Sequence, residues 1–169
     1  MNRNPCLPMP ARRGFTLIEM LVVLGIVAIL ATAALPLHEL TLRRTQEQAL
    51  REGLRSIRLA LDAHREAVLA KRIAPGPGGS PWPASLQVLV QGVPLIDDQG
   101  QAADHGPRLY LLRRLPRDPF ADPTLDAADS WGQRASDSPP EAPSAGADVF
   151  DVRSRADHTA LDGSRYRDW

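Results

Sequence analysis

Residues 11–35 read ARRGFTLIEMLVVLGIVAILATAAL, and from position 15 onward every residue is apolar or glycine apart from two threonines and Glu19. At about 1.5 Å per helical residue, this run extends roughly 31 Å, close to the ~30 Å hydrocarbon thickness of a bilayer. Three arginines and no acidic residue precede it, which predicts a cytoplasmic N-terminus. We therefore expect a membrane-spanning helix over residues 15–36, with the rest of the chain on the far side of the membrane.

A secretory signal peptide is the alternative interpretation, because the Ala-Thr-Ala at positions 31–33 imitates its cleavage site. Glu19 argues against it, since a carboxylate in an apolar helix costs on the order of 2.5 kcal/mol or more unless it is paired or functional. Cleavage between Gly14 and Phe15 would give Glu19 a use. The new ammonium group of Phe15 needs an anion once it is packed away from water, and Glu19 of a neighbouring copy can supply it and fix the axial register.

Gly14, Phe15 and Glu19 resemble the type IV prepilin signature, in which a short basic leader ends in glycine, an aromatic residue follows and glutamate is fifth in the mature chain. The resemblance implies that a prepilin peptidase removes residues 1–14 and methylates the amine of Phe15. Gly25 and Pro36 fit the same pattern as positions that weaken the helix, with a kink expected one turn before the proline. The alternative is that Pro36 ends the membrane helix.

The next segment, residues 37–74, contains strong helix formers, a single glycine and, up to Ile73, no proline. An apolar stripe runs along it, formed by Leu50, Leu54, Ile57, Leu61 and Val68. We expect this stripe to pack on the chain's own C-terminal sheet, with a coiled-coil partner as the alternative. His64 occupies the missing step of the stripe, and we expect it to be a boundary residue rather than a metal ligand.

Residues 75–169 are predicted to form a periplasmic head. The run PGPGGSPWP at 75–83 ends the helix, a short helix is expected over 84–90, and strands are expected around 131–134 and 149–154. The fold class is therefore α+β. We expect a pilin-like fold, in which the long N-terminal helix packs on a small C-terminal antiparallel sheet with irregular loops.

This head is similar to that of the G-type major pseudopilin of type II secretion. The matching segments are Leu115-Pro116-Arg117-Asp118-Pro119, Trp131-Gly132, Phe150-Asp151-Val152-Arg153-Ser154 and Asp168-Trp169. The insertion over 121–130 and the proline-rich stretch over 136–144 depart from a compact G-type head. The resemblance implies calcium held by aspartates of the C-terminal loop, here Asp157, Asp162 and Asp168. A solvated acidic turn is the alternative, because this loop lacks the family's glycines, and no other cofactor is expected.

Composition and motifs favour a structural role. Removing the leader leaves 17 basic and 20 acidic residues, which argues against nucleic acid as a partner. The single cysteine, Cys6, lies in the leader and cannot form an internal disulfide. Ser164 and His158 lie in no Gly-x-Ser-x-Gly elbow, and phosphate-binding loops and paired metal ligands are missing from the sequence. We therefore do not expect an enzyme.

The resemblances imply a single-pass inner-membrane protein of a Gram-negative bacterium, a pseudopilin that assembles into a periplasmic filament for type II secretion. The expected partners are prepilin peptidase, further copies of the chain, other pseudopilins, membrane lipid and the inner-membrane secretion platform. The alternative is a minor type IV pilin for adhesion or DNA uptake, for which Arg113, Arg114 and Arg117 would be the patch to test.

Overall fold

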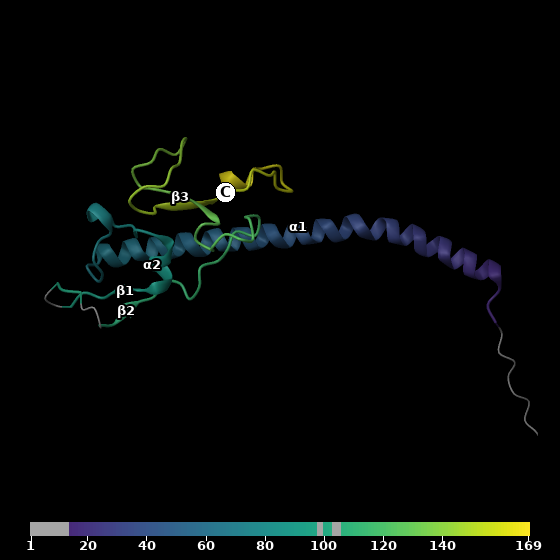
Figure 1. Cartoon of the computed structure of the whole chain (residues 1–169), viewed down its shortest axis with the longest axis horizontal. Coiled ribbons are helices and arrows are strands. Elements are labelled where there is room, and N and C mark those ends of the chain that lie inside the picture. Colours follow the sequence, from purple (N-terminus) through teal and green to yellow (C-terminus); the bar gives the residue numbers. More distant parts are fainter. Residues whose placement is uncertain (1–13, 98–99, 103–105) are drawn as a thin grey trace, which may run out of the picture. The chain divides into compact units, whose positions relative to one another are not determined.

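The computed structural model describes residues 14–97, 100–102 and 106–169, so the predicted leader lies outside the described residues except for Gly14. The helices and strands in chain order are α1 (Leu17–Leu69), α2 (Leu86–Gln91), β1 (Val93–Pro94), β2 (Arg108–Leu109), β3 (Trp131–Arg134) and β4 (Asp151–Ser154), with two short 3₁₀ turns at Pro77–Gly79 and Tyr166–Asp168 (Figure 1). The chain divides after Leu42 into an N-terminal and a C-terminal unit.

The N-terminus of α1 is capped by its own sequence. The main-chain N–H of Glu19 donates to Oγ1 of Thr16 at 3.3 Å, which makes Thr16 the N-cap of a Thr-x-x-Glu pattern. The helix then continues through both Gly25 and Pro36. Pro36 therefore does not end the helix, which excludes that alternative, while the kink stays a prediction.

The C-terminus of α1 comes four residues earlier than the expected end near Ile73. Lys71 adopts a left-handed backbone conformation with φ of 56°. The N–H of Arg72 donates to the carbonyl of Ala67 and the N–H of Lys71 to that of Val68, both at 2.9 Å. This is the Schellman arrangement that closes helices, here with lysine at the position that glycine usually occupies.

Within the described ranges, no helix has both the length and the apolarity that are needed to cross a membrane. The span expected over residues 15–36 is therefore not confirmed.

The core of the C-terminal unit forms along the predicted stripe of α1. Leu50, Leu54, Ile57 and Leu61 are all buried, as are Trp131, Val152, Leu86, Leu89 and Tyr166 from the rest of the unit. The long helix packs on the small sheet, which confirms the intramolecular interpretation of the stripe. Gly53 makes close packing possible here, because a Cβ at that position would lie only 3.2 Å from the Trp131 ring.

His64 is part of this core, so the expectation of a boundary residue was wrong. Its side chain is buried, and Nδ1 lies 3.0 Å from the carbonyl oxygen of Pro81. Burial lowers the pKa of His64 below its ordinary value, and the contact with Pro81 opposes that effect only in part. The histidine therefore joins the helix to the loop that follows it.

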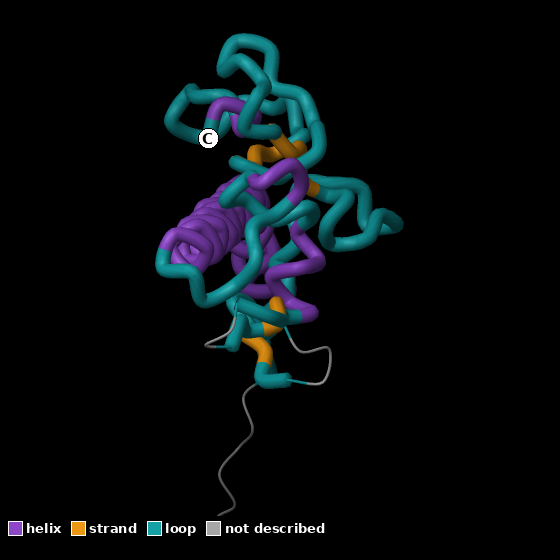
Figure 2. Tube along the Cα trace, turned by 90° about the vertical axis from the view of Figure 1, so that its left-hand side faces the viewer, coloured by secondary structure: helices purple, strands orange, loops and turns teal. Residues whose placement is uncertain are grey.

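The sheet of the head is small and antiparallel. β3 pairs with β4 from Trp131 opposite Ser154 to Arg134 opposite Asp151, which confirms the first predicted strand and shortens the second at its start. α2 occupies the place of the expected short helix. The pair of β1 and β2, which was not predicted, consists of two residues in each strand. Figure 2 shows that loops make up most of the chain after α1.

Candidate functional site

The predicted cleavage point lies in exposed, non-helical backbone. Gly14, Phe15 and Thr16 precede the first helical residue, and all three are exposed. A Cβ built on Gly14 would meet no atom within 4 Å. Exposed backbone outside regular structure is the usual site of proteolytic cleavage. The bond between Gly14 and Phe15 is therefore placed where a peptidase could reach it.

The helix that follows exposes its apolar side chains. Every large hydrophobic residue from Phe15, which is 74% exposed, to Leu30, which is 64% exposed, remains open to the surroundings within the N-terminal unit. Soluble monomers rarely leave a continuous apolar surface of this size uncovered. This surface therefore needs lipid or other subunits to cover it.

Glu19 lies in the first turn of α1, near the N-terminal end of this apolar surface. A carboxylate near a helix N-terminus gains about 0.3–1 kcal/mol from the helix dipole. Glu19 makes no ion pair with any described residue, so its charge is available to a cation from outside the chain. The capping pattern with Thr16 was missed in the sequence, although the Thr-x-x-Glu spacing could have revealed it.

Gly25, the other glycine of the predicted signature, faces open space, because a Cβ added there would meet no atom within 4 Å.

The three candidate calcium ligands contact arginines instead of gathering around one point. Asp162 accepts a hydrogen bond from Nη2 of Arg51 at 2.9 Å. Asp157 and Asp168 lie 3.2 Å and 3.8 Å from the guanidinium nitrogens of Arg167. Within the described part of the chain, no group of three or more His, Cys, Asp or Glu side chains could hold a metal ion. The structure therefore does not assemble the calcium site that the resemblance implied.

Asp162 also accepts hydrogen bonds from the hydroxyl and main-chain N–H of Ser164, at 2.5 Å and 2.9 Å. These bonds, followed by the charge of Arg51, lower the pKa of Asp162 although burial opposes them. The turn is thus held by serine and arginine contacts.

The segments that resemble a G-type head contact one another. The Asp118 carboxylate is buried and accepts hydrogen bonds from Ser154 Oγ at 2.6 Å and from the N–H of Phe120 at 2.8 Å. Nε1 of Trp131 donates to the carbonyl of Pro116 at 2.9 Å. The Leu-Pro-x-Asp-Pro turn is therefore tied to both strands of the β3–β4 pair.

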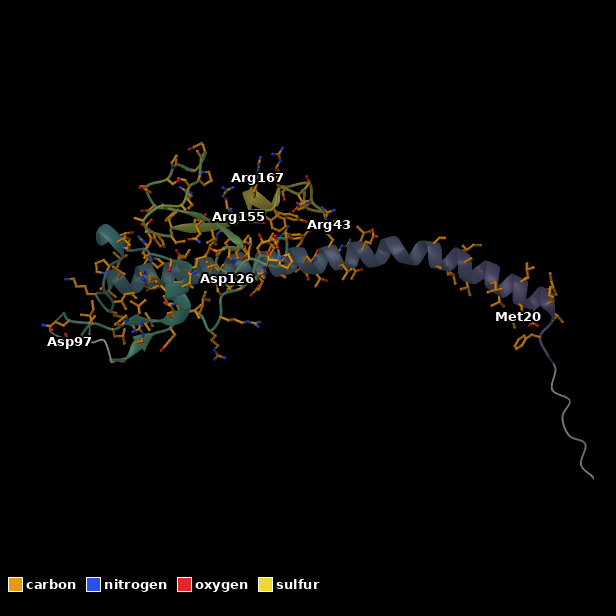
Figure 3. All side chains as sticks on the ribbon, in the orientation of Figure 1. Met20, Arg43, Asp97, Asp126, Arg155 and Arg167 are labelled. Atoms are coloured by element: carbon orange, nitrogen blue, oxygen red, sulfur yellow. The ribbon has the colours of Figure 1, made fainter. Side chains whose placement is uncertain are left out.

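A cluster that sequence reasoning missed joins α1 to the C-terminal segment. Glu47 is buried and accepts hydrogen bonds from the Tyr166 hydroxyl and from the N–H of Leu161, each at 2.8 Å. Arg43, labelled in Figure 3, donates to the carbonyl of Thr159. Further along α1, Arg58 donates to Asp151 Oδ1 at 2.8 Å.

The arginines proposed for a nucleic-acid patch differ in their surroundings. Arg113 and Arg114 are exposed. Arg117 is half-buried and donates to the main-chain oxygens of Asp122 and Leu125. Arg117 therefore holds the loop that contains Asp122 and Leu125, and only Arg113 and Arg114 of the proposed patch are exposed.

Residues 9–35 match the family model of the prokaryotic N-terminal methylation motif. The matched segment contains Gly14, Phe15, Glu19 and Gly25, and ends just before Pro36. No curated protein and no solved structure matches the chain. The motif and the α+β fold, with a long N-terminal helix on a small antiparallel sheet, together support a type IV pilin-like protein that is processed by prepilin peptidase and assembles with other pilin subunits.

Proposed function

We propose that this chain is a structural pseudopilin of a type II secretion system, without catalytic activity of its own. In this role it is anchored in the inner membrane, with its head in the periplasm, and it is added to a short filament that promotes the export of folded proteins. The observation that carries the proposal is the methylation motif over residues 9–35, placed on a helix whose apolar side chains are exposed from Phe15 to Leu30.

Assembly in this proposal depends on one charge pair. Cleavage after Gly14 creates an ammonium group on Phe15, four residues before Glu19. Phe15 lies just before α1 and Glu19 lies in its first turn, so both groups are at the same end of the helix. A neighbouring subunit displaced along the filament can therefore place its Glu19 carboxylate against this ammonium group. In an apolar surrounding, the attraction between the two charges offsets part of the desolvation cost that each would carry alone.

The contacts within the head favour the pseudopilin over the alternative. Three of the segments that carry the G-type resemblance are linked to one another: Trp131 donates a hydrogen bond to the carbonyl of Pro116, and Ser154 donates one to Asp118. The alternative is a minor type IV pilin for adhesion or DNA uptake. The methylation motif is compatible with it too, and the exposed guanidinium groups of Arg113 and Arg114 are the feature that would favour DNA uptake.

Mass spectrometry of the intact chain extracted from bacterial membranes tests the proposal. The expected mature N-terminus is Phe15, carrying one methyl group. A mature chain that begins at Ala34 and is found free in the periplasm would instead identify a secretory signal peptide, and it would remove the filament role altogether.

Duplex DNA binding distinguishes the pseudopilin from the alternative. We expect the wild-type chain and the Arg113→Ala/Arg114→Ala variant to bind DNA equally weakly. A clear loss of binding in the variant, with a salt dependence that becomes shallower by about one unit per lost phosphate contact, would favour the DNA-uptake pilin.

A further inference from the structure

An open groove of about 480 Å³ lies along α1 in the C-terminal unit. Three arginines line it, about one per helical turn: Arg51, Arg55 and Arg58. Leu59, a large apolar side chain that is 58% exposed, and Trp169 line the groove as well. We call this surface the arginine groove.

Two of these arginines are held in place. Arg51 donates to Asp162 at 2.9 Å, and its guanidinium carbon lies 4.2 Å from the centre of the Trp169 ring. Arg58 is fixed by Asp151. Arg55 is exposed and makes no ion pair with a described residue. Because Asp162 and Asp151 neutralise Arg51 and Arg58, Arg55 is the arginine of the groove that has no acidic partner among the described residues. Leu54, Leu59 and Trp169 supply the apolar part of the lining, and Asp62 is its one acidic side chain.

A surface of the opposite kind lies on the loop of residues 122–129, which we call the aspartate loop. Three exposed aspartates surround Leu125, which is 37% exposed, and the segment contains no basic residue: Asp122, Asp126 and Asp129. Figure 3 labels Asp126. This loop belongs to the insertion that departs from a compact G-type head, so the role of the filament helix does not account for it.

The aspartate loop is held in one conformation. Oδ1 of Asp122 accepts hydrogen bonds from the N–H and hydroxyl of Thr124, at 2.8 Å and 2.7 Å. Arg117 donates to two main-chain oxygens of the loop, and Arg155 donates to the main-chain oxygen of Asp129 at 3.0 Å. A loop that is ordered before binding loses less conformational entropy when it docks.

Two carboxylates of the loop, those of Asp126 and Asp129, form no ion pair with the neighbouring arginines, whereas the charge of Arg117 contributes to the lowered pKa of Asp122. Arg117 and Arg155 donate to main-chain oxygens, and Arg113 and Arg114 line a hollow with Asp126 without forming an ion pair to it. Among the described residues, Asp126 and Asp129 therefore have no cationic partner.

We propose that the aspartate loop of one copy docks into the arginine groove of a second copy, with Leu125 against Leu59 and Asp126 beside Arg55. Apolar contact at the centre and charge pairs at the rim are the usual arrangement of a protein interface. Because the two surfaces differ, the contact is heterologous, and such contacts join copies into closed rings or open filaments rather than into two-fold dimers. The filament role of the proposed function corresponds to the open form. The inference rests on the proposed function, since it assigns the contact to neighbouring heads of a filament.

Disulfide trapping tests the contact in the full chain, purified in detergent with Cys6→Ser. One tagged copy carries Leu59→Cys and a second, with a different tag, carries Leu125→Cys. The expected product is a disulfide-linked pair of the two tags. Leu69→Cys is the matched control, because Leu69 is 62% exposed on the same helix outside the groove. Equal trapping at positions 59 and 69 overturns the proposal.

A charge exchange tests the same contact. It keeps the cysteines at positions 59 and 125 and changes only the charged residues beside them. Arg55→Glu in the groove copy should slow trapping about tenfold, and Asp126→Arg in the loop copy should restore it. Arg44→Glu, on an exposed arginine of α1 outside the groove, should leave trapping unchanged. Trapping that is insensitive to Arg55→Glu, with circular dichroism unchanged, overturns the docking.

These experiments separate the docking from the proposed function. Detergent covers the apolar N-terminal helix, so trapping reports the contact between heads alone. If the disulfide-linked pair forms but the mature native chain begins at Ala34, the docking stands and the pseudopilin role is wrong. If the chain is cleaved before Phe15 and assembles into filaments but the disulfide-linked pair does not form, the pseudopilin role stands and the docking is wrong.

Discussion

The Tyr166 hydroxyl lies 2.8 Å from Oε1 of Glu47, so a buried carboxylate on α1 accepts a hydrogen bond from a tyrosine 119 residues further along the chain. The Tyr166 ring stacks on Phe120 with 4.3 Å between the ring centres. The same carboxylate oxygen accepts the N–H of Leu161. One side chain of the helix therefore holds the C-terminal segment on the core, and burial is the largest cause of the raised pKa of Tyr166.

Removal of this hydroxyl should weaken the head. Tyr166→Phe keeps the ring stack but takes away one donor from a buried carboxylate, which costs about 1–3 kcal/mol. Urea unfolding of the full chain in detergent, followed by tryptophan fluorescence, measures the change. Tyr110→Phe is the control, because Tyr110 is 63% exposed. Equal stability losses in the two variants would show that the contact with Glu47 does not stabilise the head.

The buried His64 should make stability depend on pH. Its pKa is lowered in the fold, so below about pH 6.5 the unfolded chain binds a proton that the folded chain does not. Stability should therefore fall as pH decreases from 7 through 6.5 toward the lower pKa of the folded state, by at most about 1.4 kcal/mol per pH unit. Carboxylates with lowered pKa values, such as Asp162, lose their contribution only at more acidic pH.

His64→Asn tests this assignment, because asparagine keeps a polar group near the carbonyl of Pro81 but does not titrate. Urea midpoints between pH 5 and 7 should vary less in the variant than in the wild type. His158→Asn, on an exposed residue, is the control and should keep the wild-type slope. An unchanged slope in His64→Asn would assign the pH dependence to another group.

The parts of the fold that were predicted are those with a local signal. The spacing of the α1 stripe indicated which face is buried, and the Trp-Gly pair marked the start of β3. The contact between Glu47 and Tyr166 has no such signal, because an acidic residue on a helix is usually solvated and its partner lies far away in sequence. Likewise, the end of α1 depends on a left-handed Lys71, a position where only glycine would have been noticed.

Processing should depend on the small residue before the cleavage point. Gly14→Leu should leave a precursor that is heavier by residues 1–14, because a bulky side chain next to the scissile bond should hinder the approach of the peptidase. Gly25→Leu is a matched control, since a Cβ at either glycine meets no atom within 4 Å and the fold tolerates both changes. Gel mobility and intact mass measure the outcome. Normal processing of Gly14→Leu would place the cleavage elsewhere.

The two roles of Glu19, at the start of the helix and in assembly, can be separated by substitution. Glutamine retains the Thr-x-x-Glu/Gln capping pattern with Thr16 but carries no charge. Glu19→Gln should therefore be cleaved and methylated normally, yet lose most sedimentable filament, because the ammonium group of Phe15 has no anion to pair with. Thr16→Ala should do the reverse: it weakens the cap by about 1 kcal/mol and keeps the carboxylate, so filaments should form. If Glu19→Gln assembles like the wild type while Thr16→Ala does not, Glu19 acts by starting the helix and the charge pair plays no part in assembly.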